Sequence, residues 1–193
     1  MGETSDLLVE SGPRARTRRA ILDAAVSVLS QDLSASMGDI AAAAGVGRTT
    51  LHRYFPERSD LLTAIDRDLL ERAESAVTDA RLDEGGVWEA LERLCHAYFE
   101  LDDALMLLCR EPQFLDYERW RQETEGDRAV LRLIRRGQDQ GVLDPDLDAV
   151  WIQQVLWALL IAALGHCHEK RAARYDALSL CLRTLRKAVS AGS

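Results

Sequence analysis

Between positions 48 and 53, five of the six side chains are basic or hydroxylic and could contact nucleic acid. They are Arg48, Thr49, Thr50, His52 and Arg53. Arginine forms bidentate hydrogen bonds with guanine edges, and hydroxyl and imidazole groups can donate hydrogen bonds to phosphate oxygens. The intervening Leu51 is apolar, as expected when one face of a short helix packs and the other faces outward. The pattern therefore predicts a surface that meets base edges and phosphates.

Two short helices joined by a glycine-containing turn would position these side chains. Ser36, followed three residues later by Asp39, resembles a capping box and predicts the start of the first helix. The glycines of the 45–47 segment allow a sharp turn before a second short helix over 48–55. Their apolar residues can build a shared core: Met37, Ile40, Ala41, Ala44, Val46, Leu51 and Phe55. This arrangement is typical of a helix-turn-helix unit, whose second helix enters the major groove of DNA.

A longer helix is predicted before this pair, from Arg14 to about Ser30, because apolar residues recur there at helical spacing. Arginines at its start oppose the helix dipole, so a solvated helix end is the weaker explanation for them. We expect backbone phosphate contacts from the following side chains: Arg14, Arg16 and Arg18.

Charge is distributed unevenly along the chain. The whole chain has a formal net charge of −8, which argues against indiscriminate binding to nucleic acid or anionic membranes. Residues 11–58 carry seven arginines and four acids, a net charge of +3, so the rest carries −11. An anionic partner would therefore meet the N-terminal quarter.

The string from Ile40 to Leu62 resembles the signature of the TetR family of regulators. It has an Ile-Ala pair, an Ala-Gly-Val turn, a variable triplet and a Leu before Phe55, with His52 at a usual Tyr and Arg58 at a usual Lys. The resemblance covers residues 14–62. It implies phosphate contacts by Ser36 or Met37, His52, Tyr54 and Arg58, and contacts with base edges or adjoining phosphates by Arg48, Thr49, Thr50 and Arg53. Alternatively, His52 is an ordinary surface residue and Tyr54 is partly core.

The remaining chain predicts further helices and no strands. Ser59 offers a cap for a long helix, Gly85-Gly86 marks a break, and helices are expected over about 115–140, 147–170 and 173–190. We expect an all-α fold in three parts: a disordered tail over 1–12, a helix-turn-helix domain over 13–58, and a helical ligand-binding and dimerisation domain over 59–193.

The resemblance implies a homodimer, formed by the last two helices, that binds a double-stranded DNA operator and releases it when a small molecule binds. The expected dimer interface is Trp151, Val155, Leu159, Leu178, Cys181, Leu182 and Leu185. An apolar or aromatic effector would contact Trp88, Phe99, Met106, Phe114, Trp120, Trp157 and His166. Aromatic residues on amphipathic helices are also ordinary core, so this pocket is the weaker expectation.

No cofactor or metal is expected. Side chains two residues apart on a helix, as in the 166–168 His-Cys-His string, diverge and do not converge on a metal. The four cysteines have no CxxC spacing and are expected to be buried thiols. The apolar run over 155–164 is too short to span a membrane and predicts a buried helix, and residues 1–10 lack a signal sequence, so a cytoplasmic protein is expected.

Two alternatives compete with a DNA-binding regulator. A helical hydrolase would use His96 or His166 with Cys95 or Cys109, but the sequence has no recognisable catalytic motif. A protein-binding adaptor would present aromatic or aliphatic anchors rather than the Arg, Thr and His face. The sequence does not distinguish an activator from a repressor, although a repressor is the preferred interpretation.

Overall fold

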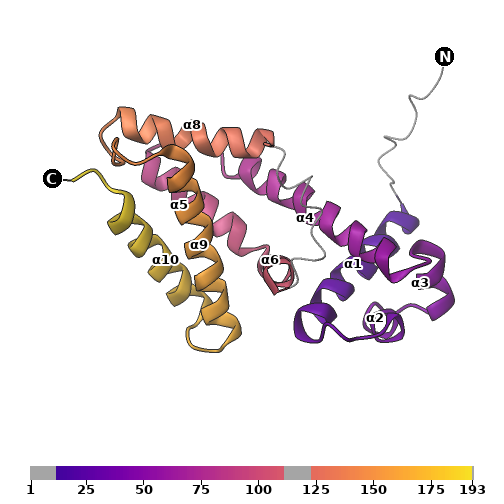
Figure 1. Cartoon of the computed structure of the whole chain (residues 1–193). Coiled ribbons are helices and arrows are strands. Elements are labelled where there is room, and N and C mark those ends of the chain that lie inside the picture. Colours follow the sequence, from indigo (N-terminus) through magenta and orange to yellow (C-terminus); the bar gives the residue numbers. More distant parts are fainter. Residues whose placement is uncertain (1–11, 111–122, 193) are drawn as a thin grey trace, which may run out of the picture. The chain divides into compact units, whose positions relative to one another are not determined.

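In this computed structural model the described residues are 12–110 and 123–192, and the side chains of 108–110 are not described. Every regular element in these two ranges is a helix, which confirms the predicted all-α fold (Figure 1). The proposed tail over 1–12 lies almost entirely outside the described residues.

The chain divides into two compact units, Met1–Ile65 and Asp66–Ser193. The boundary falls inside helix α4, Arg58–Asp79, rather than between residues 58 and 59. This helix begins one residue before Ser59, and the carboxylate of Asp60 accepts the backbone N–H of Glu57 at 2.9 Å. The hydrogen bond between a side chain and the backbone at the start of α4 is therefore accepted by Asp60 and not by Ser59.

The first unit contains α1 (Pro13–Gln31), α2 (Met37–Ala43), α3 (Arg48–Tyr54) and the beginning of α4. The predicted capping box is present: Ser36 Oγ accepts the Asp39 N–H at 3.2 Å, and Asp39 Oδ2 accepts the Ser36 N–H at 2.8 Å. Gly45 has a φ of +67°, a left-handed conformation that glycine adopts without strain, and it turns the chain from α2 towards α3. The helix-turn-helix geometry is thus encoded locally.

The second unit contains the rest of α4 together with α5 (Val87–Phe99), α6 (Asp102–Arg110), α8 (Glu125–Asp139), α9 (Ala149–His168) and α10 (Arg174–Val189). Two helix starts have clear caps, since Thr124 and Asp148 accept backbone N–H groups at α8 and α9. Residues 115–122 of the predicted 115–140 helix lie outside the described ranges.

Helix α9 differs from the buried helix that was predicted around residues 155–164. This helix of 20 residues is long and apolar enough to cross a membrane by length and composition. Over an 18-residue stretch of it the mean hydropathy is 1.6, yet only 28% of that stretch is buried. Core helices of folded domains pass the same test, and α9 packs against α5, α6, α8 and α10. One face of α9 is therefore core, while the other carries exposed apolar side chains.

Candidate nucleic-acid interface and effector site

Helix α3 presents one buried and one polar face. Leu51, and Phe55 at its C-terminal end, are 2% and 4% exposed and pack into the core of the first unit. Four predicted contact residues are exposed, namely Arg48, Thr49, His52 and Arg53, and Thr50 and Tyr54 are half-buried. The helical period of 3.6 residues produces this division, and it leaves the polar face available to a partner.

The structure brings three predicted contact residues together around one aromatic ring. The guanidinium carbons of Arg14 and Arg53 lie 6.0 Å and 5.8 Å from the centroid of Tyr54, within the range of cation–π attraction. These three residues line, together with Pro13 and Thr17, an open hollow of about 610 Å3. Arg18 lies over Phe55 at 5.7 Å, while Arg16 is exposed. Residues from the start of α1 and from the end of α3 therefore line the same hollow and form one basic surface.

Arg58 does not extend from this surface as a phosphate ligand would. Its Nη1 and Nη2 donate hydrogen bonds to the carbonyl oxygens of Ala35 and Leu33, at 2.5 Å and 2.7 Å. The side chain therefore ties α4 to the segment that precedes α2. Of the other residues expected near a phosphate, Ser36 is exposed and engaged in the capping box, and Met37 is half-buried.

In the second unit, an aromatic pair joins α5 to α9. The rings of Tyr98 and Trp157 are 4.5 Å apart and inclined by 33°. Tyr98 is buried, and burial, followed by the negative charges of Asp127 and Glu74, raises the pKa of its hydroxyl. Asp127 accepts a hydrogen bond from Gln153 Nε2 at 3.1 Å, and Glu74 accepts the Gly126 N–H at 2.9 Å. Aromatic faces and carboxylates thus occur in one region of the second unit.

The predicted effector residues do not all meet at this pair. Phe99 and Met106 are buried, whereas His166 is exposed. Phe114 and Trp120 lie outside the described residues. Tyr98 is not among the predicted effector residues. A tyrosine surrounded by apolar residues in the sequence is the signal that could have found it, because its hydroxyl is a polar group on a ring that is often buried.

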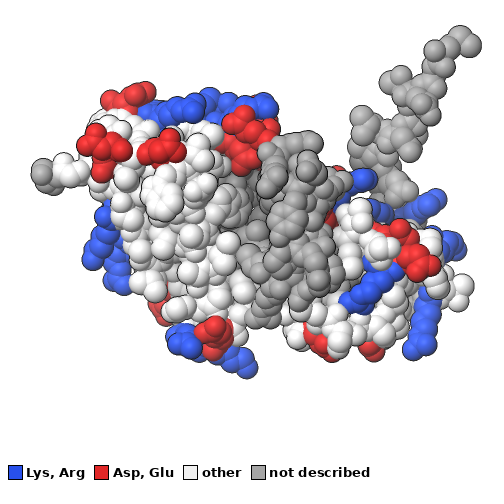
Figure 2. All heavy atoms as spheres, viewed as in Figure 1, with Lys and Arg blue, Asp and Glu red and all other residues white. Residues whose placement is uncertain are grey.

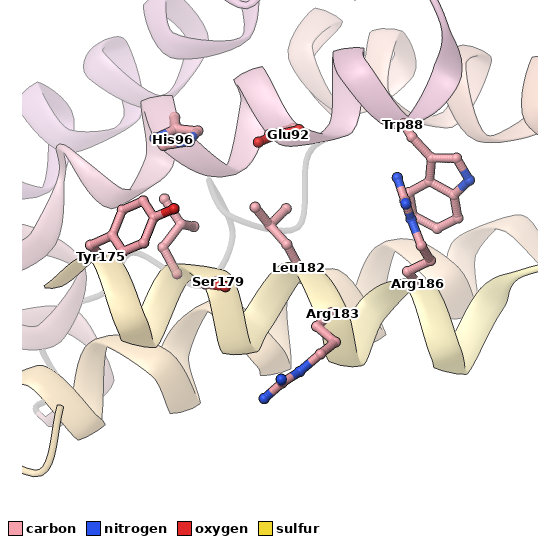
Figure 3. Close-up of a pocket in the computed structure, with 9 residues that line it drawn as sticks. Trp88, Glu92, His96, Tyr175, Ser179, Leu182, Arg183 and Arg186 are labelled. Atoms are coloured by element: carbon pink, nitrogen blue, oxygen red, sulfur yellow. The ribbon is translucent and has the colours of Figure 1, made fainter. Parts of the chain in front are cut away.

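Trp88 lies instead in an open groove of about 320 Å3 between α5 and α10 (Figure 3). The groove is lined by Trp88, Glu92, His96, Tyr175, Leu178, Ser179, Leu182, Arg183 and Arg186. The guanidinium carbon of Arg186 lies 4.8 Å from the Trp88 ring centroid. Trp88 and His96 are eight residues apart on the same outer face of α5, so neither belongs with the Tyr98–Trp157 pair.

The seven predicted dimer residues separate into two groups. Leu178, Cys181 and Leu185 are buried within the chain itself, and Leu182 lines the groove. Trp151 is 56% exposed, and Val155 and Leu159 are half-buried on α9. The surface over α9 has few charged side chains (Figure 2).

Two further clusters bear on the alternatives. Contact with the Cys181 thiol, together with burial, raises the pKa of Cys95, so this thiol is poorly suited to act as the nucleophile of a hydrolase. His168 Nε2 lies 2.8 Å from Asp102 and 3.7 Å from Asp103, and these three ligand atoms could surround a metal ion. Asp102 also pairs with Arg174 at 2.9 Å, so this carboxylate already has a cationic partner.

The exposed polar helix α3, the glycine turn before it and the basic hollow beside it define a helix-turn-helix DNA-binding protein with a separate helical unit. A family model described as "Bacterial regulatory proteins, tetR family" matches residues 21–65. The chain belongs to the TetR family and is a ligand-responsive, DNA-binding transcriptional regulator.

Two relatives illustrate the match. The HTH-type transcriptional repressor LfrR of Mycolicibacterium smegmatis is 41% identical over 155 residues, which cover 80% of each chain. The regulator BetI of Agrobacterium fabrum is 32% identical over 87 residues, or 44% of this chain and 42% of BetI. The crystal structure of LfrR in complex with proflavine superposes with a TM-score of 0.74, covering 88% of this chain and 95% of that one at 34% identity.

Proposed function

We propose that this regulator is a repressor whose homodimer holds a palindromic operator and releases it when a planar aromatic cation binds. The observation that carries the effector class is the buried Tyr98 beside Trp157, with the carboxylates of Glu74 and Asp127 acting on it. Aromatic rings favour flat π-systems, and nearby carboxylates favour positive charge. LfrR has been crystallised with proflavine, a planar aromatic cation, which supports the same class here.

The DNA contacts are proposed from the first unit. Arg48, Thr49 and Thr50 begin α3 and would read base edges, because the N-terminal residues of a recognition helix reach them. Phosphate contacts are assigned to the basic hollow and its surroundings, that is Arg14, Arg16, Arg18, His52, Arg53 and Tyr54. Ser36 and Met37, which lie at the start of α2, would approach the sugar-phosphate backbone of the DNA. Because the family consists of bacterial DNA-binding regulators, the protein would act in the cytoplasm.

The dimer interface is proposed to lie on the outer face of α9 and α10. Trp151, Val150 and Ile161 of α9 are 56%, 45% and 37% exposed, and Leu180 of α10 is 40% exposed. Large apolar side chains grouped on one weakly charged face are typical of an interface between subunits. Two copies would place two α3 helices about one DNA turn apart, roughly 34–36 Å, and a palindrome would match their symmetry.

Selection of random duplexes by the purified protein, followed by titration of the enriched sequence, tests this function. We expect a palindrome to be enriched, and we expect proflavine to lower the affinity for it. If a palindrome is enriched but proflavine does not change the affinity for it, the proposed effector class is wrong and the DNA-binding function stands. If the folded protein enriches no sequence, the adaptor interpretation is favoured.

A further inference from the structure

Gly38, at the start of α2, and Arg48, at the start of α3, are packed against each other. A Cβ atom added at Gly38 would lie 2.8 Å from Nη2, 2.9 Å from Cζ and 2.9 Å from Nε of Arg48. Three atoms of the planar guanidinium are thus almost equally distant from one point, so the plane lies flat over the glycine. Real Cβ atoms essentially never approach other atoms within 3.0 Å, so a Cβ atom at position 38 would require the flexible end of Arg48 to move. The guanidinium therefore occupies the space that a side chain at position 38 would need.

Electrostatic attraction acts at the same place. The pKa of Asp39 is lowered, first by the hydrogen bonds from the Ser36 hydroxyl and backbone N–H and further by the positive charge of Arg48. Arg48 thus has a residue without a side chain beneath its guanidinium and a carboxylate whose charge attracts it, although it remains an exposed residue. Both features hold the end of a long side chain that would otherwise sample many rotamers.

We propose that Gly38 is a positioning residue for DNA readout: by having no side chain, it lets Arg48 lie across α2 in a fixed orientation before DNA binds. This inference rests on the proposed reading role of α3. A side chain that is already ordered loses less conformational entropy on binding, so pre-ordering strengthens the contact that Arg48 makes. Gly38 would then influence the preferred base without touching DNA.

The test compares Gly38→Ala and wild-type protein, as full-length chains, on the duplex that wild-type protein selects. Alanine favours helix formation over glycine, so the variant should remain folded, and its Tm is measured to verify this. We expect affinity for the selected duplex to fall about 2- to 10-fold, with little change on a scrambled duplex. A repeated selection with the variant should show weaker preference at the bases that Arg48 contacts.

A double-mutant comparison separates positioning from any other effect of the added methyl group. In an Arg48→Ala background, Gly38→Ala should change affinity by less than about 2-fold, because the positioned side chain is gone. Gly47→Ala is a matched control: Gly47 has an ordinary φ of −71°, and its added Cβ would meet nothing within 4 Å. This control should bind the selected duplex nearly as wild-type protein does.

Each outcome is decisive. Equal losses from Gly38→Ala with and without Arg48 would overturn the positioning role, and so would an unchanged affinity in the single variant. If wild-type protein selects no sequence, the proposed base-reading role of α3 is wrong, and so is the positioning role of Gly38 that depends on it. Wild-type selection together with an inert Gly38→Ala would remove this inference alone.

Discussion

The ring of Trp157 on α9 lies 4.5 Å from the ring of Tyr98 on α5, and this contact joins two helices of the second unit through a pair of aromatic faces. An incoming planar ligand could stack on the opposite face of the Trp157 ring, which is half-buried. We expect Trp157→Leu to weaken proflavine binding about 2- to 10-fold, because aromatic contacts add stabilisation beyond area burial. Fluorescence titration of proflavine measures the effect.

Trp88→Leu is the control for this prediction. Trp88 is also a tryptophan of the second unit, but it lines the outer groove beside Arg186. Its replacement should leave proflavine affinity unchanged. Equal losses from both variants would show that the Tyr98–Trp157 pair has no special role in binding the ligand.

The two arginines beside Tyr54 should contribute mainly charge. We expect Arg14→Ala and Arg53→Ala to weaken binding to selected and scrambled duplexes alike, and to reduce the slope of log affinity against log salt by about 1 each. Arg48→Ala should instead weaken binding to the selected duplex more than binding to the scrambled duplex. Arg183→Ala, which removes an exposed arginine of α10, serves as the control. If Arg48→Ala affects all duplexes equally, its base-reading role is wrong.

Arg58 should matter for stability rather than for direct phosphate contact. Arg58→Met removes the donors to the carbonyls of Leu33 and Ala35, and we expect the free energy of unfolding to fall by about 1.5–3 kcal/mol. Chemical denaturation measures this, with Arg53→Met as an exposed control. The salt slope of DNA binding should remain that of wild-type protein. A slope reduced by about 1 would restore the phosphate contact implied by the family resemblance.

The capping box of α2 should make stability depend on pH. The pKa of Asp39 is lowered, chiefly by the hydrogen bond from the Ser36 hydroxyl. A lowered pKa in the folded state contributes stability above the unfolded value of about 3.8, and this contribution is lost as pH falls through the folded pKa. Asp39→Asn should therefore lower the Tm at pH 7 and have a shrinking effect below pH 4. If the Tm of Asp39→Asn is still lower than that of wild-type protein at pH 2, the charge of the Asp39 carboxylate is not the cause of the difference.

The exposed apolar face of α9 should hold the dimer together. Trp151→Asp places a charge where Trp151 is 56% exposed, and we expect the dimer dissociation constant to rise at least tenfold, by roughly 1.4 kcal/mol or more. Sedimentation equilibrium measures this constant. Tyr175→Asp is the control, because Tyr175 is a 78% exposed aromatic residue that lines the groove. A stable dimer of Trp151→Asp would place the interface elsewhere.

The first unit could be predicted from the sequence in detail because its signals are local. Ser36 and Asp39 are three residues apart, and the glycines at 45 and 47 lie between two apolar segments, so neighbouring residues determine the caps and the turn. Arg58 could not be placed in this way. Its hydrogen-bond partner Leu33 is 25 residues away, and only the packed domain shows that the guanidinium is engaged there.

The second unit was predicted less well because helical spacing does not tell a core face from a pocket or an interface. Leu178 and Trp151 both fit an apolar helix face, yet one is 5% and the other 56% exposed. The region around Tyr98 depends on Glu74 and Asp127, which come from α4 and α8, and no sequence spacing relates them to a residue on α5. Sites of this kind require tertiary structure.

The contact between Gly38 and Arg48 also bears on how such a protein could be re-engineered or could diverge. A recognition helix is often regarded as a portable cassette, but a graft of α3 alone would place its first arginine against whatever residue the host has in α2. A host with any side chain at that position would displace the guanidinium, and the transplanted helix would lose part of its preference. The residues that determine the preferred DNA sequence would therefore lie in two separate helices, and Gly38 of α2 would have to be transferred together with Arg48 of α3.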